Sequence, residues 1–393
     1  MGGCVAFETE RLPVIVSFDE TAAFTETYGF AGSSGKVYLE GQRIVPKNHA
    51  AKTALLFMHP ASTLNLMPLP AALAQAGMHV MCCASRYAKN DTALIMEKVA
   101  ADLGAYVRFA REDLGYERVV LCGWSGGGSL AMFYQAQAEN PTITHTPAGD
   151  PYSLAAANLL PADAVMFIAA HTGRSRVLAE WIDPSVTDES APDNRDFSLD
   201  LYHPDCAEKP PYSAGFVERF RKAQRARVER ITANARTMLD ELKRRGGNEV
   251  ERPFIVHRTM ADPRFLDASL DSNGRKENWC YLGVPETVNT GPVGLARFST
   301  LRAWLSQWSY EDSVADAVTW APKVSAPMLI VENGADDAVP PSHVRDVRTA
   351  ASVVSPDYRF IDGANHYYRD QPERRGEAVA VLQAWLEERG LTG

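Results

Sequence analysis

Several common features are scarce in this 393-residue chain, and each scarcity argues against a class of protein. Cysteine occurs six times at irregular spacing, which argues against a disulfide framework and fits reduced thiols in a cytoplasmic protein. Lysine and arginine number 40 against 49 acidic residues, so the net charge is -9 and we expect no nucleic-acid partner. No segment approaches the roughly 20 consecutive apolar residues that span a bilayer, and the first residues lack the pattern of a secretory signal. We therefore expect a soluble protein with no membrane partner.

Metal-binding patterns are also missing. None of the nine histidines stands at H-x-H or H-E-x-x-H spacing from another. We predict that the protein holds no metal and uses no cofactor.

Short apolar runs alternate with helical stretches over much of the chain. This alternation is typical of an α/β fold with a mostly parallel central sheet and helices on both faces. A leading antiparallel pair is expected at 12–18 and 36–45, joined through a Gly/Ser turn at 32–35. The later strands are expected at 54–58, 79–84, 118–122, 163–170, 328–332 and 358–362, and the helices at 68–76, 92–113, 126–139, 341–351 and 373–389.

The alternation stops between residues 171 and 320, where a loop rich in Pro, Asp and Ser precedes a long helical segment and irregular sequence. We interpret this stretch as a largely helical cap inserted into one sheet domain, whose core is formed by residues 1–170 and 321–393. Five of the seven tryptophans lie in it, either packing the insertion onto the sheet or lining a pocket for a bulky apolar substrate.

Within this stretch, apolar residues at spacings of three and four predict a helix over 215–245. Its opposite face is strongly basic. We interpret that face as solvated and as balancing the acidic loop before it, with anion binding or a subunit contact as the alternative. The sequence leaves open whether the protein forms a homodimer.

The most informative motif is Gly123-Trp124-Ser125-Gly126-Gly127, directly after the apolar run ending at Cys122. A serine in a sharp turn between a strand and a helix takes a sparsely populated backbone conformation, and its neighbours approach so closely that side chains do not fit two residues before and after it. Gly123 and Gly127 meet that demand. The motif predicts an exposed, nucleophilic Ser125.

A serine hydroxyl needs a base and an acid to become a nucleophile at neutral pH. His366 follows the last expected strand, and Asp336 follows the strand before it, so both should lie at the carboxyl edge of the sheet near Ser125. Asp337 is the alternative acid. We prefer Asp336 because the catalytic acid in such turns usually stands four residues before a proline, here Pro340.

The order Ser125, Asp336, His366 and the motifs GWSGG, NGADDAVP and DGANH resemble the α/β-hydrolase superfamily, specifically its serine esterase-like members with a cap. The resemblance covers about 50–170 and 322–390. It implies that Ser125 attacks a carbonyl, that His366 moves the proton and that Asp336 orients His366. Haloalkane and epoxide hydrolases carry a carboxylate at the position of Ser125, which argues against both.

The resemblance also implies an oxyanion hole built from backbone N-H groups. Gly126 supplies one. The loop at His59-Pro60-Ala61-Ser62 supplies the other, and since proline has no N-H we predict Ala61, with Ser62 as the alternate. His59 is expected to brace this loop, and Trp124 to contact substrate.

Together these observations predict a serine hydrolase that cleaves a carboxylic ester of a bulky, largely apolar small molecule through an acyl-enzyme. An acyltransferase or a carbon-carbon bond hydrolase with the same triad is the first alternative. A non-catalytic binding protein on the same fold is the second, although such proteins commonly lack a triad residue.

Overall fold

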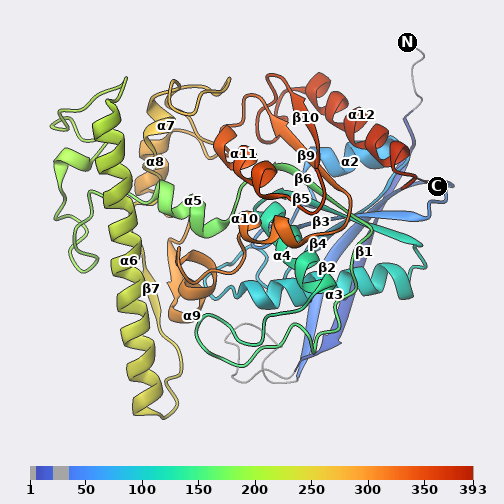
Figure 1. Ribbon diagram of the computed structural model, residues 1–393, viewed down its shortest axis with the longest axis horizontal. Coiled ribbons are helices and arrows are strands. Elements are labelled where there is room, and N and C mark those ends of the chain that lie inside the picture. The colour runs from blue at the N-terminus through green and yellow to red at the C-terminus, as the bar shows by residue number, and fades with distance from the viewer. Residues whose placement is uncertain (1–5, 21–34, 393) are drawn as a thin grey trace.

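The computed structural model describes residues 6–20 and 35–392, in which eight strands form one twisted sheet (Figure 1). The spatial order is β1-β2-β4-β3-β5-β6-β9-β10. The first two strands pair antiparallel, β2 pairs antiparallel with β4, and the remaining neighbours are parallel. The strands are β1 (Thr9–Asp19), β2 (Lys36–Pro46), β3 (Thr53–His59), β4 (His79–Ala84), β5 (Arg118–Ser125), β6 (Ala164–Ala170), β9 (Met328–Asn333) and β10 (Asp357–Ile361).

The predicted fold class and the predicted strands are confirmed. Most of the Gly/Ser turn proposed between the first two strands lies outside the described residues. Every residue of β3, β4 and β6 is buried, which is why these strands are continuous apolar runs with no alternation.

Helices cover both faces of the sheet. Leu56 and Met58 point into the hydrophobic cluster on one face, while Leu55 and Phe57 point into the cluster on the other. The first face is covered by α3 (Met96–Glu112), α4 (Gly126–Glu139) and α11 (Pro341–Ala350), and the second by α2 (Pro68–Gln75) and α12 (Pro372–Glu388).

The helix predicted from residue 92 begins later, at Met96. Residues 91–94 instead form a turn in which the amide of Leu94 donates to the carbonyl of Asp91. This turn matters for the site, because Asp91 lines the cavity described below.

No strand of the large sheet comes from the described chain between β6 and β9. This segment contains a small antiparallel pair and several helices, and Trp304 and Trp308 form part of its own hydrophobic cluster. Its elements are α5 (Arg174–Trp181), α6 (Ala214–Arg245), β7 (Pro253–Ile255), α7 (Pro263–Leu266), α8 (Pro285–Thr290), β8 (Phe298–Thr300), α9 (Leu301–Ala303) and α10 (Ala317–Trp320). The long helix α6 lies at the side of the molecule away from the sheet (Figure 1). The division into core and cap stays a prediction.

The basic face of α6 is only partly solvated. Arg219 and Lys222 are exposed, as predicted for a solvated face. Arg227 contradicts that interpretation, because it is buried, pairs with Glu189 at 2.7 Å and donates to three backbone carbonyls. Glu189 belongs to the acidic loop, so part of the predicted charge balance is a buried ion pair.

None of the described helices is both long and apolar enough to cross a membrane.

Candidate active site

Ser125 occupies a sharp turn between β5 and α4. Its φ of 55° and ψ of -126° lie in a region that residues with a side chain rarely adopt. The flanking glycines permit the turn, because a Cβ at Gly123 would lie 2.5 Å from the carbonyl oxygen of Gly127, and one at Gly127 would overlap the carbonyl oxygen of Met58. The sequence motif therefore corresponds to a steric requirement of the backbone.

The structure brings the three predicted polar side chains together. Nε2 of His366 lies 3.2 Å from Oγ of Ser125, and Nδ1 of His366 lies 3.0 Å from Oδ2 of Asp336. With the proton on Nδ1 donated to the carboxylate, Nε2 is left as the acceptor for the serine hydroxyl. His366 and Asp336 are almost fully buried, which strengthens these electrostatic interactions.

Asp336, and not Asp337, holds the hydrogen bond to His366. The second carboxylate oxygen of Asp336 accepts from the amides of Ala338 at 2.8 Å and Val339 at 2.7 Å. These bonds fix the carboxylate in the turn after β9. Burial raises the pKa of Asp337, whose peptide carbonyl accepts from the amide of Tyr281.

Trp124 supports the histidine. Its indole N-H donates to the carbonyl of His366 at 3.2 Å, and the two rings lie 4.5 Å apart. The side chain is buried but lines the cavity above Ser125, so its predicted contact with substrate stays a prediction.

The loop after β3 differs from a simple oxyanion loop. The amide of Ala61 donates to Nδ1 of His59 at 3.1 Å, so in this conformation that N-H is already used. Burial lowers the pKa of His59 well below its ordinary value, which leaves the ring neutral with its proton on Nε2. His59 thus braces the loop as expected, while Ala61 and Ser62 stay predictions as oxyanion donors. Gly126 begins α4 next to Ser125.

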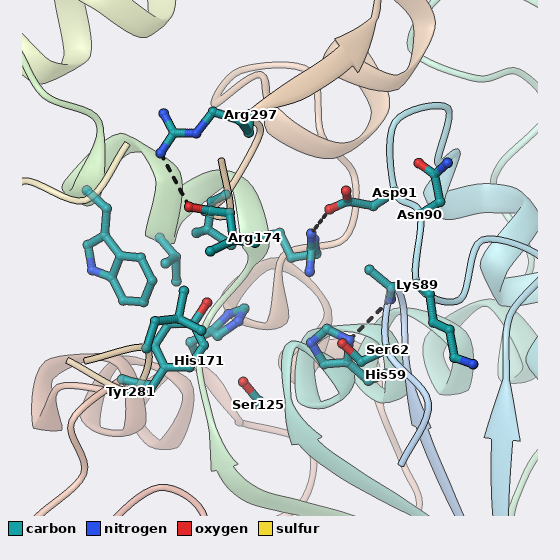
Figure 2. Close-up of a pocket in the computed structure, with 18 of the residues that line it drawn as sticks. His59, Ser62, Lys89, Asn90, Asp91, Ser125, His171, Arg174, Tyr281 and Arg297 are labelled. Carbon is teal, nitrogen blue, oxygen red and sulfur yellow. Dashed lines mark hydrogen bonds and ion pairs between the residues drawn. The ribbon is translucent and has the colours of Figure 1, made fainter. Parts of the chain in front are cut away.

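A cavity of about 500 Å³ lies over Ser125 (Figure 2). In Figure 2, Ser125 lies below the cavity centre, His171 and His59 lie near it, and Arg174 stands above with Asp91 beside it. Apolar side chains form part of the wall: Val177, Trp181, Tyr281, Leu282, Pro292, Val293, Leu295 and Phe298.

Sequence reasoning missed His171 and Arg174. His171 directly follows β6, so the rule that placed Asp336 and His366 at the carboxyl edge of the sheet could have indicated it. It is buried, its Nδ1 has no hydrogen-bond partner in the described part of the chain, and burial lowers its pKa well below the ordinary value. Arg174 opens α5 and carried no comparable signal.

The described residues contain no group of three or more His, Cys, Asp or Glu side chains that could hold a metal ion. All five described cysteines are free and buried.

Comparisons with known proteins leave the family open. No protein-family model matches the sequence, and no curated protein matches it. Similar solved structures include a DcsB complex with its substrate analogue, 12% identical over 96% of this chain and 99% of that one, with a TM-score of 0.48. The esterase domain of a Rhodothermus marinus protein is 12% identical over 96% of this chain and 98% of that one, with a TM-score of 0.47. The Paleococcus ferrophilus monoacylglycerol lipase is 14% identical over 88% of this chain and 98% of that one, with a TM-score of 0.45. The fold assignment rests on this chain's own strand order and helices.

Proposed function

We propose that this protein is a serine hydrolase that cleaves a carboxylic ester through an acyl-enzyme intermediate. The observation that carries the proposal is the continuous hydrogen-bonded series Ser125, His366, Asp336 at the base of a cavity. A serine in a strained turn, a buried imidazole and a fixed carboxylate are what nucleophilic attack on an ester requires.

In the proposed first step, Oγ of Ser125 attacks the ester carbonyl carbon while Nε2 of His366 takes the hydroxyl proton. The carbonyl oxygen becomes an oxyanion, which the amide of Gly126 and a donor from the loop after β3 stabilise. Collapse breaks the bond to the alcohol, which leaves with the proton from His366. A water molecule then repeats the sequence and releases the acid. Asp336 stabilises the imidazolium in both steps.

The cavity also supports the expectation of a bulky apolar group. Its volume is typical of sites for small organic molecules, and Trp181, Tyr281 and Phe298 contribute aromatic surface to its wall. We expect kcat/KM for 4-nitrophenyl esters to rise from acetyl to octanoyl, because each added methylene that becomes buried contributes about 0.8 kcal/mol of favourable free energy. Equal or higher values for the acetyl ester would contradict this preference.

Replacing Ser125 by alanine tests the mechanism. The Ser125→Ala variant should lose at least about 10³-fold in kcat while its circular dichroism spectrum and melting temperature stay unchanged, since only the nucleophile is removed. A fluorophosphonate should label the wild type and not this variant. Ser190→Ala is the matched control, because Ser190 lies in a surface loop and its loss should leave labelling intact. Normal turnover by Ser125→Ala would refute the mechanism.

The assay with 4-nitrophenyl esters also separates hydrolysis from acyl transfer. With an alcohol acceptor present, a hydrolase releases free acid, whereas an acyltransferase forms the new ester in preference.

A further inference from the structure

The cavity over Ser125 carries more positive than negative charge. Its lining includes Lys89, Arg174 and Arg297 but only one carboxylate, that of Asp91. The two lining histidines do not add to this balance, since burial keeps both rings neutral. The carboxylate of Asp336 is engaged with His366 and is outside the lining. A ligand in this cavity therefore meets net positive charge.

Arg174 is the lining cation that pairs with the cavity's carboxylate. It begins α5, and only 7% of its surface is exposed. One nitrogen, Nη2, pairs with Asp91 at 2.5 Å, and the guanidinium lies 4.5 Å from the ring centre of Trp308. Nε and Nη1 make no hydrogen bond to any described residue, and Nε is buried.

The unpaired N-H of Nε is costly, because this buried group has lost its water without gaining an acceptor. Burial lowers the pKa of Arg174, and the opposing effects of Asp91 and Tyr281 are smaller. If Arg174 served only to link α5 to the turn at Asp91, Nη2 would be the only nitrogen it needed. Nη1, which has no acceptor among the described residues and is not buried in the way Nε is, remains available to a ligand.

Arg297 adds charge to the cavity without contacting a carboxylate. Nη2 donates to three backbone carbonyls and Nη1 to one, at 3.2–3.5 Å, which occupies most of their donors. Burial, with Arg227 and Arg258 nearby, lowers its pKa to about 10, so it stays protonated at neutral pH. Lys89 is exposed at the cavity wall and forms no ion pair with a described residue. Both extend the positive field around Arg174.

We propose that the substrate carries a carboxylate that binds Arg174 while the scissile ester lies at Ser125. Cleavage of the ester at Ser125 rests on the proposed function. The anion site adds the class of substrate, which is an ester with an apolar body and an anionic group. The aromatic and aliphatic wall holds the body, and the free donors of Arg174 take the carboxylate, for which a planar guanidinium is well suited.

Three matched 4-nitrophenyl esters test the proposal on the full-length protein. Their acyl chains have one length and end in a carboxylate, a carboxamide or a methyl group. The wild type should prefer the carboxylate over the carboxamide by about tenfold or more in kcat/KM, mainly through KM, as expected for a charged hydrogen bond. A carboxylate-to-carboxamide ratio of one or less would overturn the proposal. If both of these esters were then cleaved faster than the methyl ester, Arg174 would be recognising neutral acceptors and not an anion.

Two variants locate the preference. Arg174→Gln should bring the carboxylate-to-carboxamide ratio close to one, because the donor charge is gone. Asp91→Asn should raise the ratio, because it removes the carboxylate that competes with the ligand for Arg174. Each ratio is internal to one variant, so a general loss of activity cancels. If Arg174→Gln fails to fold, the direction of the Asp91→Asn change decides, and an unchanged or lower ratio contradicts the proposal.

A binding measurement separates failure of this proposal from failure of the hydrolase assignment. Calorimetric titration of Ser125→Ala with the carboxylate and carboxamide esters reports anion recognition without turnover. Tighter binding of the carboxylate supports the anion site even if no ester is cleaved. Equal affinities with normal wild-type turnover reject the anion site and leave the hydrolase assignment standing.

Discussion

Two adjacent aspartates, Asp336 and Asp337, follow β9, and their surroundings give them different roles. One carboxylate oxygen of Asp336 accepts hydrogen bonds from two backbone amides, and the other accepts one from His366. Its position is therefore fixed by three hydrogen bonds, while the pKa of Asp337 is raised by burial. In the proposed mechanism only Asp336 can hold the histidine tautomer that accepts the serine proton.

The matched pair Asp336→Asn and Asp337→Asn tests this difference. Asp336→Asn should lower kcat by about 10⁴-fold, as the loss of the correct tautomer does in serine-protease triads, whereas Asp337→Asn should change it less than about tenfold. Steady-state kinetics on a 4-nitrophenyl ester, with thermal melts as the folding control, gives the comparison. A larger loss in Asp337→Asn would assign the acid to the other aspartate.

Sequence alone predicted that Ser125, His366 and Asp336 act together, because each has a local signal: glycines around a serine, or a polar residue just after an apolar strand. Arg174 and Asp91 had none. Their pairing joins residues 83 positions apart, and an ion pair between distant positions leaves no periodic trace in the sequence. The choice of a second oxyanion donor was also ambiguous from the sequence, since the bond from Ala61 to His59 depends on how the loop turns.

At the scale of elements, α3 meets the turn at Trp304–Trp308 through a buried carboxyl. Oε2 of Glu97 accepts from the hydroxyl of Ser306 at 2.8 Å, and that hydroxyl accepts from the amide of Met96. Oε1 has no partner. Burial raises the pKa of Glu97 from 4.5 to about 7, so the folded state favours the protonated carboxyl.

This carboxyl predicts a stability that depends on pH. Between pH 4.5 and 7 the folded state binds the proton that the unfolded state has released, so the contribution of Glu97 to the free energy of unfolding should fall as pH rises through that window. The full effect is about 3 kcal/mol, and Glu97→Gln should remove it. Urea unfolding at pH 4 and pH 8 measures the difference.

The exposed Glu112, which lies on the same helix, provides the control. Glu112→Gln should keep the wild-type pH dependence. If Glu97→Gln keeps it as well, Glu97 is ionised in the folded protein and the assignment is wrong.

Across the whole molecule, the segment between β6 and β9 is tied to the sheet by several buried contacts. Glu180 of α5 lies 2.9 Å from His343 of α11, Ser306 binds Glu97, and Trp320 packs 5.5 Å from Phe133. Because these contacts are distributed along the segment and reach α3, α4 and α11, loss of the segment would expose the helices that cover one face of the sheet.

We therefore expect one cooperative unfolding transition. Five of the seven tryptophans lie in residues 171–320, so tryptophan fluorescence reports mainly on that segment while far-ultraviolet circular dichroism reports on the whole chain. Thermal or urea curves from the two probes should coincide. An earlier fluorescence transition would show that the segment unfolds on its own.

The sequence by itself determined the sheet, the helices around it and the placement of Ser125, Asp336 and His366, because local periodicity and turn chemistry are written in neighbouring residues. Helix starts shifted by a few positions, and the buried role of Arg227 was not foreseen, since burial of a charge depends on the partner that reaches it. Tertiary structure alone decided the walls and charge of the cavity. Those depend on which distant side chains meet, and so the residues proposed to select a substrate could be named only from the folded structure.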